Sequence, residues 1–348
     1  MNRATRTKAI GAIGAGLLSL VVVGCGRGED AQAGGNGSGD GSCTVAFSQE
    51  SLGFEWMVEN SRDMKAAVEA KGCEFIQADA EGDAAKQLQD VRDLLARKPD
   101  LLVVRPVTFE PLAPVPGLAD EAGVPLIVVD RALPGTPGEG QYKAFLTIDF
   151  VETGELVGES VVRGLTEKNG SPTGRIVHIT GTSGASPVLD EQEGIDNVLT
   201  KNPGIEEVAQ CDGNYSREPG RQCMEDLLQR FNAGEIDGVI ADNDEMALGA
   251  VAAIKAAGRD ELLGWIWGKD AQRTGLEAIV AGDMRMSIST PPQFGELTMK
   301  TWQQVQDGNV SETTQLLPKT VYEADTDKGK KAIEDRIAEL TDLGIDCC

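Results

Sequence analysis

Short apolar segments recur along the chain from residue 43 onward, and each is followed by a loop and a longer segment with helical spacing. The apolar segments lack strict alternation with polar residues, which is typical of strands buried on both faces of a parallel sheet. In the predicted helix 56–70, Met57, Met64 and Val68 mark one face. The first series of predicted strands comprises 44–48, 74–77, 101–104, 125–129 and 144–148.

A second series with the same plan begins at residue 175. Its predicted strands, each followed by a helical stretch, comprise 175–180, 205–208, 236–241, 263–267 and 284–289. Two successive βαβ series favour an α/β fold with two doubly wound, parallel-sheet lobes. The length of 348 residues also suits two ordinary domains.

The first 42 residues do not share this pattern. A positive segment with Arg3, Arg6 and Lys8 precedes an apolar stretch, 9–23, that is shorter than the roughly 20 residues of a membrane span. We therefore predict a signal peptide over 1–24 and a Gly-rich, flexible linker over 25–42. The sequence Val-Val-Gly-Cys ending at Cys25 resembles the bacterial lipobox, which implies lipidation of Cys25 and anchoring at the outer face of the membrane. An ordinary signal peptide with an incidental cysteine is the alternative.

Charge and histidine content exclude several classes of function. The chain has 56 acidic against 32 basic residues, a formal net charge of −24, and no cluster of Lys and Arg. This balance opposes binding to a phosphate backbone, so no nucleic-acid partner is expected. The single histidine, His178, lies in a predicted buried strand and is expected to be structural. We expect no metal and no cofactor.

Six cysteines remain beyond Cys25, and an even number in an exported chain favours disulfides. Spacing alone leaves fifteen connectivities open. Cys43 and Cys73 begin the first two predicted strands, whereas Cys211 and Cys223 bracket a short loop, so we predict these two pairs. The adjacent Cys347 and Cys348 either bridge each other or stay free.

The residues that follow the predicted strands carry the chemistry, because ligands of open parallel sheets bind beyond the carboxyl ends of the strands. These residues are rich in side chains that make several hydrogen bonds and poor in pairs of nucleophile and base. The sequence has no phosphate-binding loop, no G-x-S-x-G and no H-E-x-x-H. A binding protein is therefore favoured over an enzyme. Glycoside hydrolysis by two carboxyl groups is the enzymatic alternative.

Several motifs resemble the type I periplasmic binding proteins, the sugar-binding proteins of bacterial ABC importers. They are Val-Ala-Phe-Ser-Gln at 45–49, Val-Val-Asp-Arg at 128–131, the Gly-Thr-Ser motif at 181–186, Asn-Tyr-Ser-Arg at 214–217 and Ala-Asp-Asn-Asp-Glu-Met at 241–246. The similarity covers 43–326 and is greatest to ribose and galactofuranose binders.

This resemblance implies three crossovers, near 149, 290 and 318, with ligand enclosed by hinge closure. The N-terminal lobe would comprise 43–149 plus 290–318, and the C-terminal lobe 150–289 plus 319–348.

The resemblance also implies a ligand site. Asp130 and Arg131 would bracket vicinal hydroxyls, Asn243 would supply an amide from the opposite lobe, and Trp56 and Tyr215 would stack on the sugar ring. The full set of expected ligand-binding residues is Gln49, Trp56, Arg105, Asp130, Arg131, Asp149, Glu191, Tyr215, Arg217, Asn243, Trp267 and Thr290.

The expected site departs from the family pattern at several positions. Glu191 stands where the resemblance predicts an arginine, Trp267 where it predicts an aspartate, Arg105 where it predicts an asparagine or a small residue, and Met57 where the galactofuranose type has an arginine. Losing a partner for a buried hydroxyl costs roughly 1–3 kcal/mol, so a different preferred ligand is expected. We expect Glu191 and Trp267 to face the ligand from the second lobe and Arg105 from the first. An ion pair between Glu191 and Arg105 without ligand contact is the alternative.

Together these features predict a monomeric, exported, lipid-anchored receptor that delivers a small sugar or sugar-like ligand to an ABC permease. Two alternatives stay open: a receptor of the same fold that signals to a membrane protein, and a binder of an amine-bearing or nucleoside-like solute. Transcriptional repressors share the lobes, but they need an N-terminal DNA-binding domain where this chain has an export signal.

Overall fold

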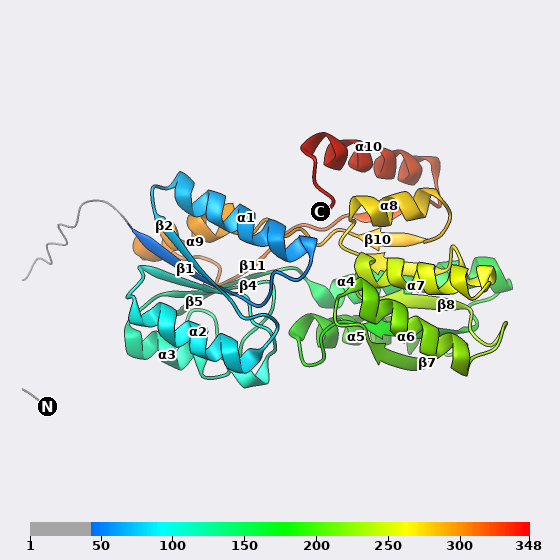
Figure 1. Ribbon diagram of the computed structural model, residues 1–348, viewed down its shortest axis with the longest axis horizontal. Helices are drawn as coiled ribbons and strands as arrows, with labels where there is room; N and C mark the ends of the chain where they lie inside the picture. The colour runs from blue at the N-terminus through cyan, green and yellow to red at the C-terminus, as the bar shows by residue number, and fades with distance from the viewer. Residues whose placement is uncertain (1–42) are drawn as a thin grey trace, which may run out of the picture. The chain divides into compact units, whose positions relative to one another are not determined.

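The computed structural model describes residues 43–348, which form two six-stranded sheets flanked by helices (Figure 1). The predicted fold class, two doubly wound α/β lobes, is confirmed. The predicted signal peptide, the lipidation site Cys25 and the linker to residue 42 lie outside the described residues.

The first sheet has the strand order β11-β5-β4-β3-β1-β2, with all of its strands parallel. Its strands are β1 (Thr44–Gln49), β2 (Glu74–Asp79), β3 (Leu101–Val104), β4 (Leu126–Val129), β5 (Tyr142–Thr147) and β11 (Thr314–Leu316). Its helices are α1 (Glu55–Ala70), α2 (Ala84–Ala96), α3 (Val115–Ala122) and α9 (Gly295–Gln306), with a 3₁₀ turn at Glu110–Leu112.

The second sheet has the order β12-β10-β9-β8-β6-β7, and only its short edge strand β12 is antiparallel. Its strands are β6 (Gly174–Thr180), β7 (Ile205–Asp212), β8 (Gly238–Ala241), β9 (Ile266–Lys269), β10 (Met286–Ile288) and β12 (Val321–Glu323). Its helices are α4 (Phe150–Asn169), α5 (Ser186–Leu199), α6 (Arg217–Arg230), α7 (Asp244–Ala256), α8 (Arg273–Val280) and α10 (Asp327–Leu343), with a 3₁₀ turn at Asp260–Leu262.

Within residues 43–348 the chain passes between the sheets three times. It leaves the first sheet after β5, returns from β10 to α9, and leaves again between β11 and β12. The expected three crossovers are therefore present. They place the carboxyl ends of both sets of parallel strands next to the connecting segments.

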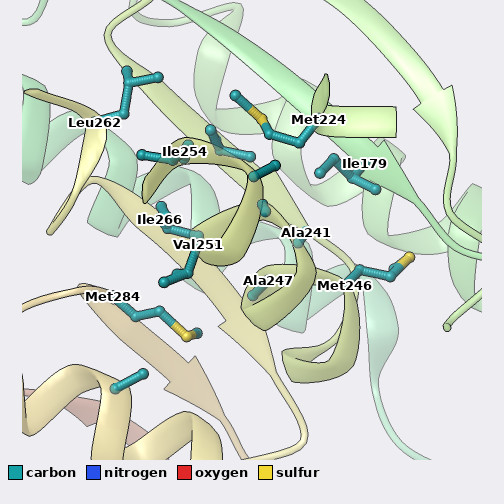
Figure 2. Packing of buried hydrophobic residues seen from close by; sticks show 14 of the residues in the cluster. Ile179, Met224, Ala241, Met246, Ala247, Val251, Ile254, Leu262, Ile266 and Met284 are labelled. Carbon is teal, nitrogen blue, oxygen red and sulfur yellow. The ribbon is translucent and has the colours of Figure 1, made fainter. Parts of the chain in front are cut away.

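Buried strand residues alternate between the two faces of each sheet. In the first sheet, Val45 and Phe47 pack with α1 and α9, whereas Ala46 packs with α2 and α3. In the second, Ile266 faces α6, α7 and α8 while the next residue, Trp267, faces α4 and α5. Figure 2 shows the face of the second sheet that α6, α7 and α8 cover, where Met246, Val251 and other residues of α7 pack against the strands. Each sheet is thus covered on both faces, as its apolar central strands predict.

The six cysteines within residues 43–348 lie in three pairs, 43 with 73, 211 with 223 and 347 with 348. The Cα atoms of Cys43 and Cys73, at the starts of β1 and β2, are 4.5 Å apart, and those of Cys211 and Cys223 are 6.0 Å apart. Both spacings are within the range that a disulfide spans. Among the described residues, no helix is both long and apolar enough to cross a membrane.

Candidate ligand-binding site

One cavity is lined by residues of both sheets and of a connecting segment. The cavity is small, with a volume of about 30 Å³ open to the centres of water-sized spheres. Its lining residues are Phe54, Trp56, Arg105, Asp130, Arg131, Phe150, Pro187, Tyr215, Lys269, Asp270 and Thr290. They follow strand ends, start helices or lie in a crossover, which is where open parallel sheets bind ligands.

The wall formed by the first sheet is a buried network of arginines and carboxylates. Arg105 donates to Asp130 at 2.7 Å and lies 3.1 Å from Glu50, while Arg131 pairs with Glu50 and donates to the carbonyl of Val107 at 2.8 Å. Burial lowers the pKa of Arg131 to about 10, and burial also lowers the pKa of Arg105 against the opposing effect of Asp130. Both guanidinium groups remain charged at neutral pH.

Two aromatic rings, one from each sheet, lie against these arginines. The Arg105 guanidinium lies 4.5 Å from the centre of the Trp56 ring, and that of Arg131 lies 5.3 Å from the centre of the Tyr215 ring. The Trp56 indole donates to the carbonyl of Thr290 at 2.6 Å, so the start of α1 is tied to the crossover after β10. These contacts fix the orientation of both arginines and both rings.

The wall formed by the second sheet centres on the end of β9. Lys269 is the last residue of the strand and pairs with Glu191 of α5, and Asp270 follows and accepts a hydrogen bond from the Thr290 hydroxyl. Burial raises the pKa of Asp270 to about 6 and that of Glu191 to about 8, although Lys269 opposes both shifts. The two carboxyl groups are therefore more easily protonated than exposed ones.

Three cavity residues adopt a backbone conformation that side chains other than glycine rarely take. The φ angle is +62° at Asp130, +53° at Tyr215 and +98° at Asp270. Each such residue costs on the order of 1–2 kcal/mol, and strain of this kind clusters at functional sites. A glycine assists one of them: a Cβ atom on Gly181 would overlap the Tyr215 ring.

Six of the twelve predicted ligand-binding residues, all of which are described, line this cavity: Trp56, Arg105, Asp130, Arg131, Tyr215 and Thr290. Three others do not line it and stabilise local structure instead. The Gln49 amide donates to Asn60 at 2.9 Å, Asp149 caps α4, and Asn243 caps α7 and donates to the carbonyl of Tyr215 at 3.1 Å.

Arg217 is also absent from the cavity lining. It is half exposed and makes a two-pronged ion pair with Glu245.

The prediction that Trp267 faces the ligand is wrong. The predicted strand 263–267 is shifted: β9 begins at Ile266 and ends at Lys269, so Trp267 is an interior strand residue. Its indole is fully buried in the core and donates to Ser160 at 2.9 Å. The aspartate expected after this strand is consequently present, as Asp270.

Glu191 is buried behind the cavity rather than on its surface, and its partner is Lys269. The suggested ion pair with Arg105 is therefore wrong, because the described ion pairs of Arg105 are with Glu50 and Asp130. Close packing of α4 on α5 holds Glu191 in place, since a Cβ atom on Gly154 would collide with its carbonyl oxygen.

Sequence reasoning missed five lining residues: Phe54, Phe150, Pro187, Lys269 and Asp270. The true end of β9 would have revealed the last two.

His178 lies behind the wall formed by the second sheet, buried in β6, where it bonds to Asp242 at 2.6 Å. Burial disfavours its charge, but Asp242 and Glu207 raise its pKa to about 10. Among residues 43–348, no group of His, Cys, Asp and Glu side chains is arranged to hold a metal ion.

The chain is similar to known proteins over most of its length. The family model for the periplasmic binding protein domain matches residues 45–309. The galactofuranose-binding protein YtfQ of Escherichia coli is 30% identical over 291 residues, covering 82% of this chain and 89% of its own length. A xylitol-binding protein of Mycolicibacterium smegmatis is 30% identical over 305 residues, covering 87% of this chain and 81% of its own.

Solved structures show the same fold. The crystal structure of a galactofuranose-binding protein matches with a TM-score of 0.78 and 25% identity, over 87% of this chain and 99% of that one. A Mycobacterium smegmatis protein in complex with β-D-fucofuranose matches with a TM-score of 0.77 and 30% identity, over 86% and 97%. The chain therefore belongs to the periplasmic binding protein family, as a type I sugar-binding protein of ABC importers, and its family members are solute-binding proteins rather than enzymes.

Proposed function

We propose that the protein captures a small hydroxylated ring, a sugar or a related polyol, in the cavity between its two sheets and delivers it to an ABC permease. The observation that carries this proposal is the cavity wall, in which Arg105, Asp130 and Arg131 from one sheet face Lys269 and Asp270 from the other. Carboxylates accept from hydroxyls and guanidinium groups donate to them, so the two sheets offer complementary contacts to one ligand.

Unpaired polar atoms in the wall support the proposal. The Nε atoms of Arg105 and Arg131 and the hydroxyl of Tyr215 are buried without a hydrogen-bond partner among the described residues. Buried polar groups are normally paired, and each unpaired one costs roughly 1–3 kcal/mol. Ligand hydroxyls are suitable partners, because a hydroxyl both donates and accepts.

Residues 43–149 plus 290–318 and residues 150–289 plus 319–348 would move as two rigid lobes about the three crossovers. Thr290 lies in one crossover and contacts both Trp56 and Asp270, so ligand binding would be coupled to the relative position of the lobes. Glu191 would act indirectly, by holding Lys269.

Export, anchoring and disulfides belong to the same proposal. The signal sequence and lipidation of Cys25 would hold a monomeric receptor at the outer face of the membrane, and the pairs 43–73, 211–223 and 347–348 would be oxidised there. A Cys25→Ala variant should leave the membrane fraction. Peptide mapping without reductant should recover the linked pairs, and free thiols in exported material would contradict them.

Delivery to a permease is favoured over signalling. Several relatives at 24–26% identity are named as ribose import binding proteins. A fructose-binding periplasmic domain of a hybrid two-component system also shares the fold, with a TM-score of 0.75 and 25% identity, so the preference for delivery rests on the import proteins among the relatives.

A thermal-shift screen against sugars, polyols, amino sugars, sugar acids and nucleosides tests the proposal. A ligand at 100 times its Kd adds about 2.7 kcal/mol of stability, a shift that such a screen detects. We expect at least one hydroxylated ring to stabilise the protein and an Arg131→Met variant to lose that stabilisation. Stabilisation by nucleosides alone, or by none of these classes, would contradict the proposal.

A further inference from the structure

The charges that form and back the cavity do not balance. Three cations face four carboxylates, all of them less than 8% exposed: Arg105, Arg131 and Lys269 against Glu50, Asp130, Glu191 and Asp270. All three cations pair with Glu50, Asp130 or Glu191, so the fourth carboxylate, Asp270, is left without a cation among the described residues. Excess charge in a buried site is costly unless a partner of opposite sign is present.

Asp270 is the carboxylate without a direct cation. Glu50 pairs with both arginines, Asp130 pairs with Arg105, and Glu191 pairs with Lys269. Among the described residues, Asp270 accepts from the Thr290 hydroxyl and forms no ion pair. The raised pKa of this side chain has the same cause, since burial outweighs the more distant Lys269 and Arg105.

Lys269 is held away from Asp270 although it is next to it in the sequence. Its ammonium group pairs with Glu191 and lies 5.4 Å and 5.6 Å from the centres of the Phe150 and Tyr215 rings. Three contacts therefore hold it between α4, α5 and the loop that follows β7.

The groups behind this wall do not supply the missing positive charge. His178 is held between Asp242, at 2.6 Å, and Glu207, at 3.7 Å, so this cluster adds one cation and two carboxylates.

We propose that the ligand carries an ammonium group as well as hydroxyls, as an amino sugar or an aminocyclitol does, and that Asp270 is the counter-ion of that ammonium. The ligand's hydroxyls would accept from the unpaired Nε atoms of Arg105 and Arg131, and its ammonium would donate to Asp270 and to the unpaired Tyr215 hydroxyl. This inference rests on the proposed function and names the ligand class for the same cavity.

Matched ligand sets test this inference. The first set consists of D-galactose and three derivatives that each differ from it at one position: D-galactosamine, N-acetyl-D-galactosamine and D-galacturonate. The corresponding glucose and inositol compounds form a second and a third set. Titration calorimetry at pH 7 should show at least tenfold tighter binding of an amine-bearing member than of its neutral parent and its N-acetyl derivative. Asp270→Asn should abolish that preference, whereas Asp335→Asn, on the exposed face of α10, should keep it.

The possible outcomes distinguish failure of this inference from failure of the proposed function. Equal or tighter binding of the neutral parents, with the screen otherwise positive, overturns the inference and leaves the proposed function intact. A preference for the amine that survives Asp270→Asn also overturns it. Binding of no member of any set contradicts the proposed function as well.

A second inference rests on a separate feature, the segment 345–348 that follows α10. Asp346 is bound to the start of α8: its carbonyl accepts from the Arg273 N–H at 2.6 Å, and its carboxylate accepts from the Thr274 hydroxyl at 3.0 Å. Ile345 packs against the core of the second sheet. Cys347 and Cys348, a few residues further along, are buried in the core of the first sheet. Figure 1 shows the end of the chain between α1 and α8.

We infer that this segment is a fourth, noncovalent link between the lobes that restrains their separation. In the absence of ligand, Asp346→Ala should raise the radius of gyration measured by small-angle X-ray scattering, because the link to α8 is lost. Asp342→Ala, at an exposed position of the preceding helix, is the control. Circular dichroism checks that both variants are folded. An unchanged radius of gyration in folded Asp346→Ala protein would overturn the inference.

Discussion

The two walls of the cavity differ in how their charges are arranged. In the wall from the first sheet, Glu50 and Asp130 are each bound to arginine, so its buried charges are compensated within the wall. In the wall from the second sheet, Lys269 is bound to Glu191 behind the cavity, which leaves Asp270 with a hydroxyl donor alone. The first wall is thus a preassembled network, whereas the second offers an uncompensated carboxylate. This difference suggests that the first wall supplies rigid hydroxyl contacts and the second selects among ligands.

The largest effect should come from breaking the network of the first wall. Glu50→Gln removes the carboxylate that both arginines share, and leaving buried charges without a partner costs about 3–5 kcal/mol. Denaturant unfolding of the ligand-free protein measures this loss. Glu69→Gln, which breaks an exposed ion pair on α1, should change stability by less than about 0.5 kcal/mol. Equal effects of the two variants would contradict the network.

Removing a buried carboxylate from the second wall should instead stabilise the ligand-free protein. Burial raises the pKa of Asp270 from 3.8 to about 6, so the folded protein holds this proton more tightly than the unfolded chain does. The stability that the protonated side chain contributes is therefore complete below about pH 4 and is lost as the pH rises through 6. Asp270→Asn removes that loss, so the ligand-free variant should be more stable than wild type by about 2–3 kcal/mol at pH 7 and equal to it near pH 4. Urea unfolding at both pH values measures this. A variant that is less stable at pH 7 would show that Asp270 is compensated after all.

Ligand contact by the first wall predicts a loss of affinity without a loss of fold. Asp130→Asn keeps the size of the side chain, and asparagine tolerates the positive φ at this position. Removing the charge should weaken ligand binding by about 1.5–3 kcal/mol, since hydrogen bonds to charged groups contribute this much. Calorimetry with the ligand found in the screen measures the change, and the exposed Asp93→Asn serves as the control. Unchanged affinity would remove Asp130 from the site.

Substitutions of Trp56 and of Trp267 should distinguish a cavity residue from a core residue. Trp267→Phe loses the hydrogen bond to Ser160 and should cost about 1–2 kcal/mol of stability with little change in affinity. Trp56→Phe should weaken ligand binding, because Trp56 lines the cavity and orients Arg105. Paired unfolding and binding measurements on both variants are needed. A loss of affinity in Trp267→Phe alone would reverse the assignment.

The first wall was predictable from sequence because its strands end clearly. Apolar runs stop at Val104 and Val129, so Arg105 and Asp130 are visibly the residues that follow. In the second lobe, the apolar segment that begins at Leu263 includes loop residues, and the last strand residue is the polar Lys269. The sequence pattern therefore predicts a strand that begins and ends too early, with Trp267 as its last residue.

Other parts of the site carry no local signal. Phe150 and Pro187 lie at the starts of α4 and α5, where only the packing of helices on the sheet brings them to the cavity. Strands β11 and β12 have three residues each and are partly polar, so periodicity does not reveal them. Asn243 has the residue type of a ligand contact and of a helix cap, and the structure uses it as a cap.

The central claim is that one ligand is held by both walls at once. The most direct test of this claim is a calorimetric titration with the ligand found in the thermal-shift screen. The titration is carried out on wild type, Asp130→Asn, Asp270→Asn and the double variant. The account predicts that each single variant loses at least tenfold in affinity and that the double variant shows no measurable binding heat. Wild-type affinity in either single variant would mean that only one wall contacts the ligand, and would contradict the account.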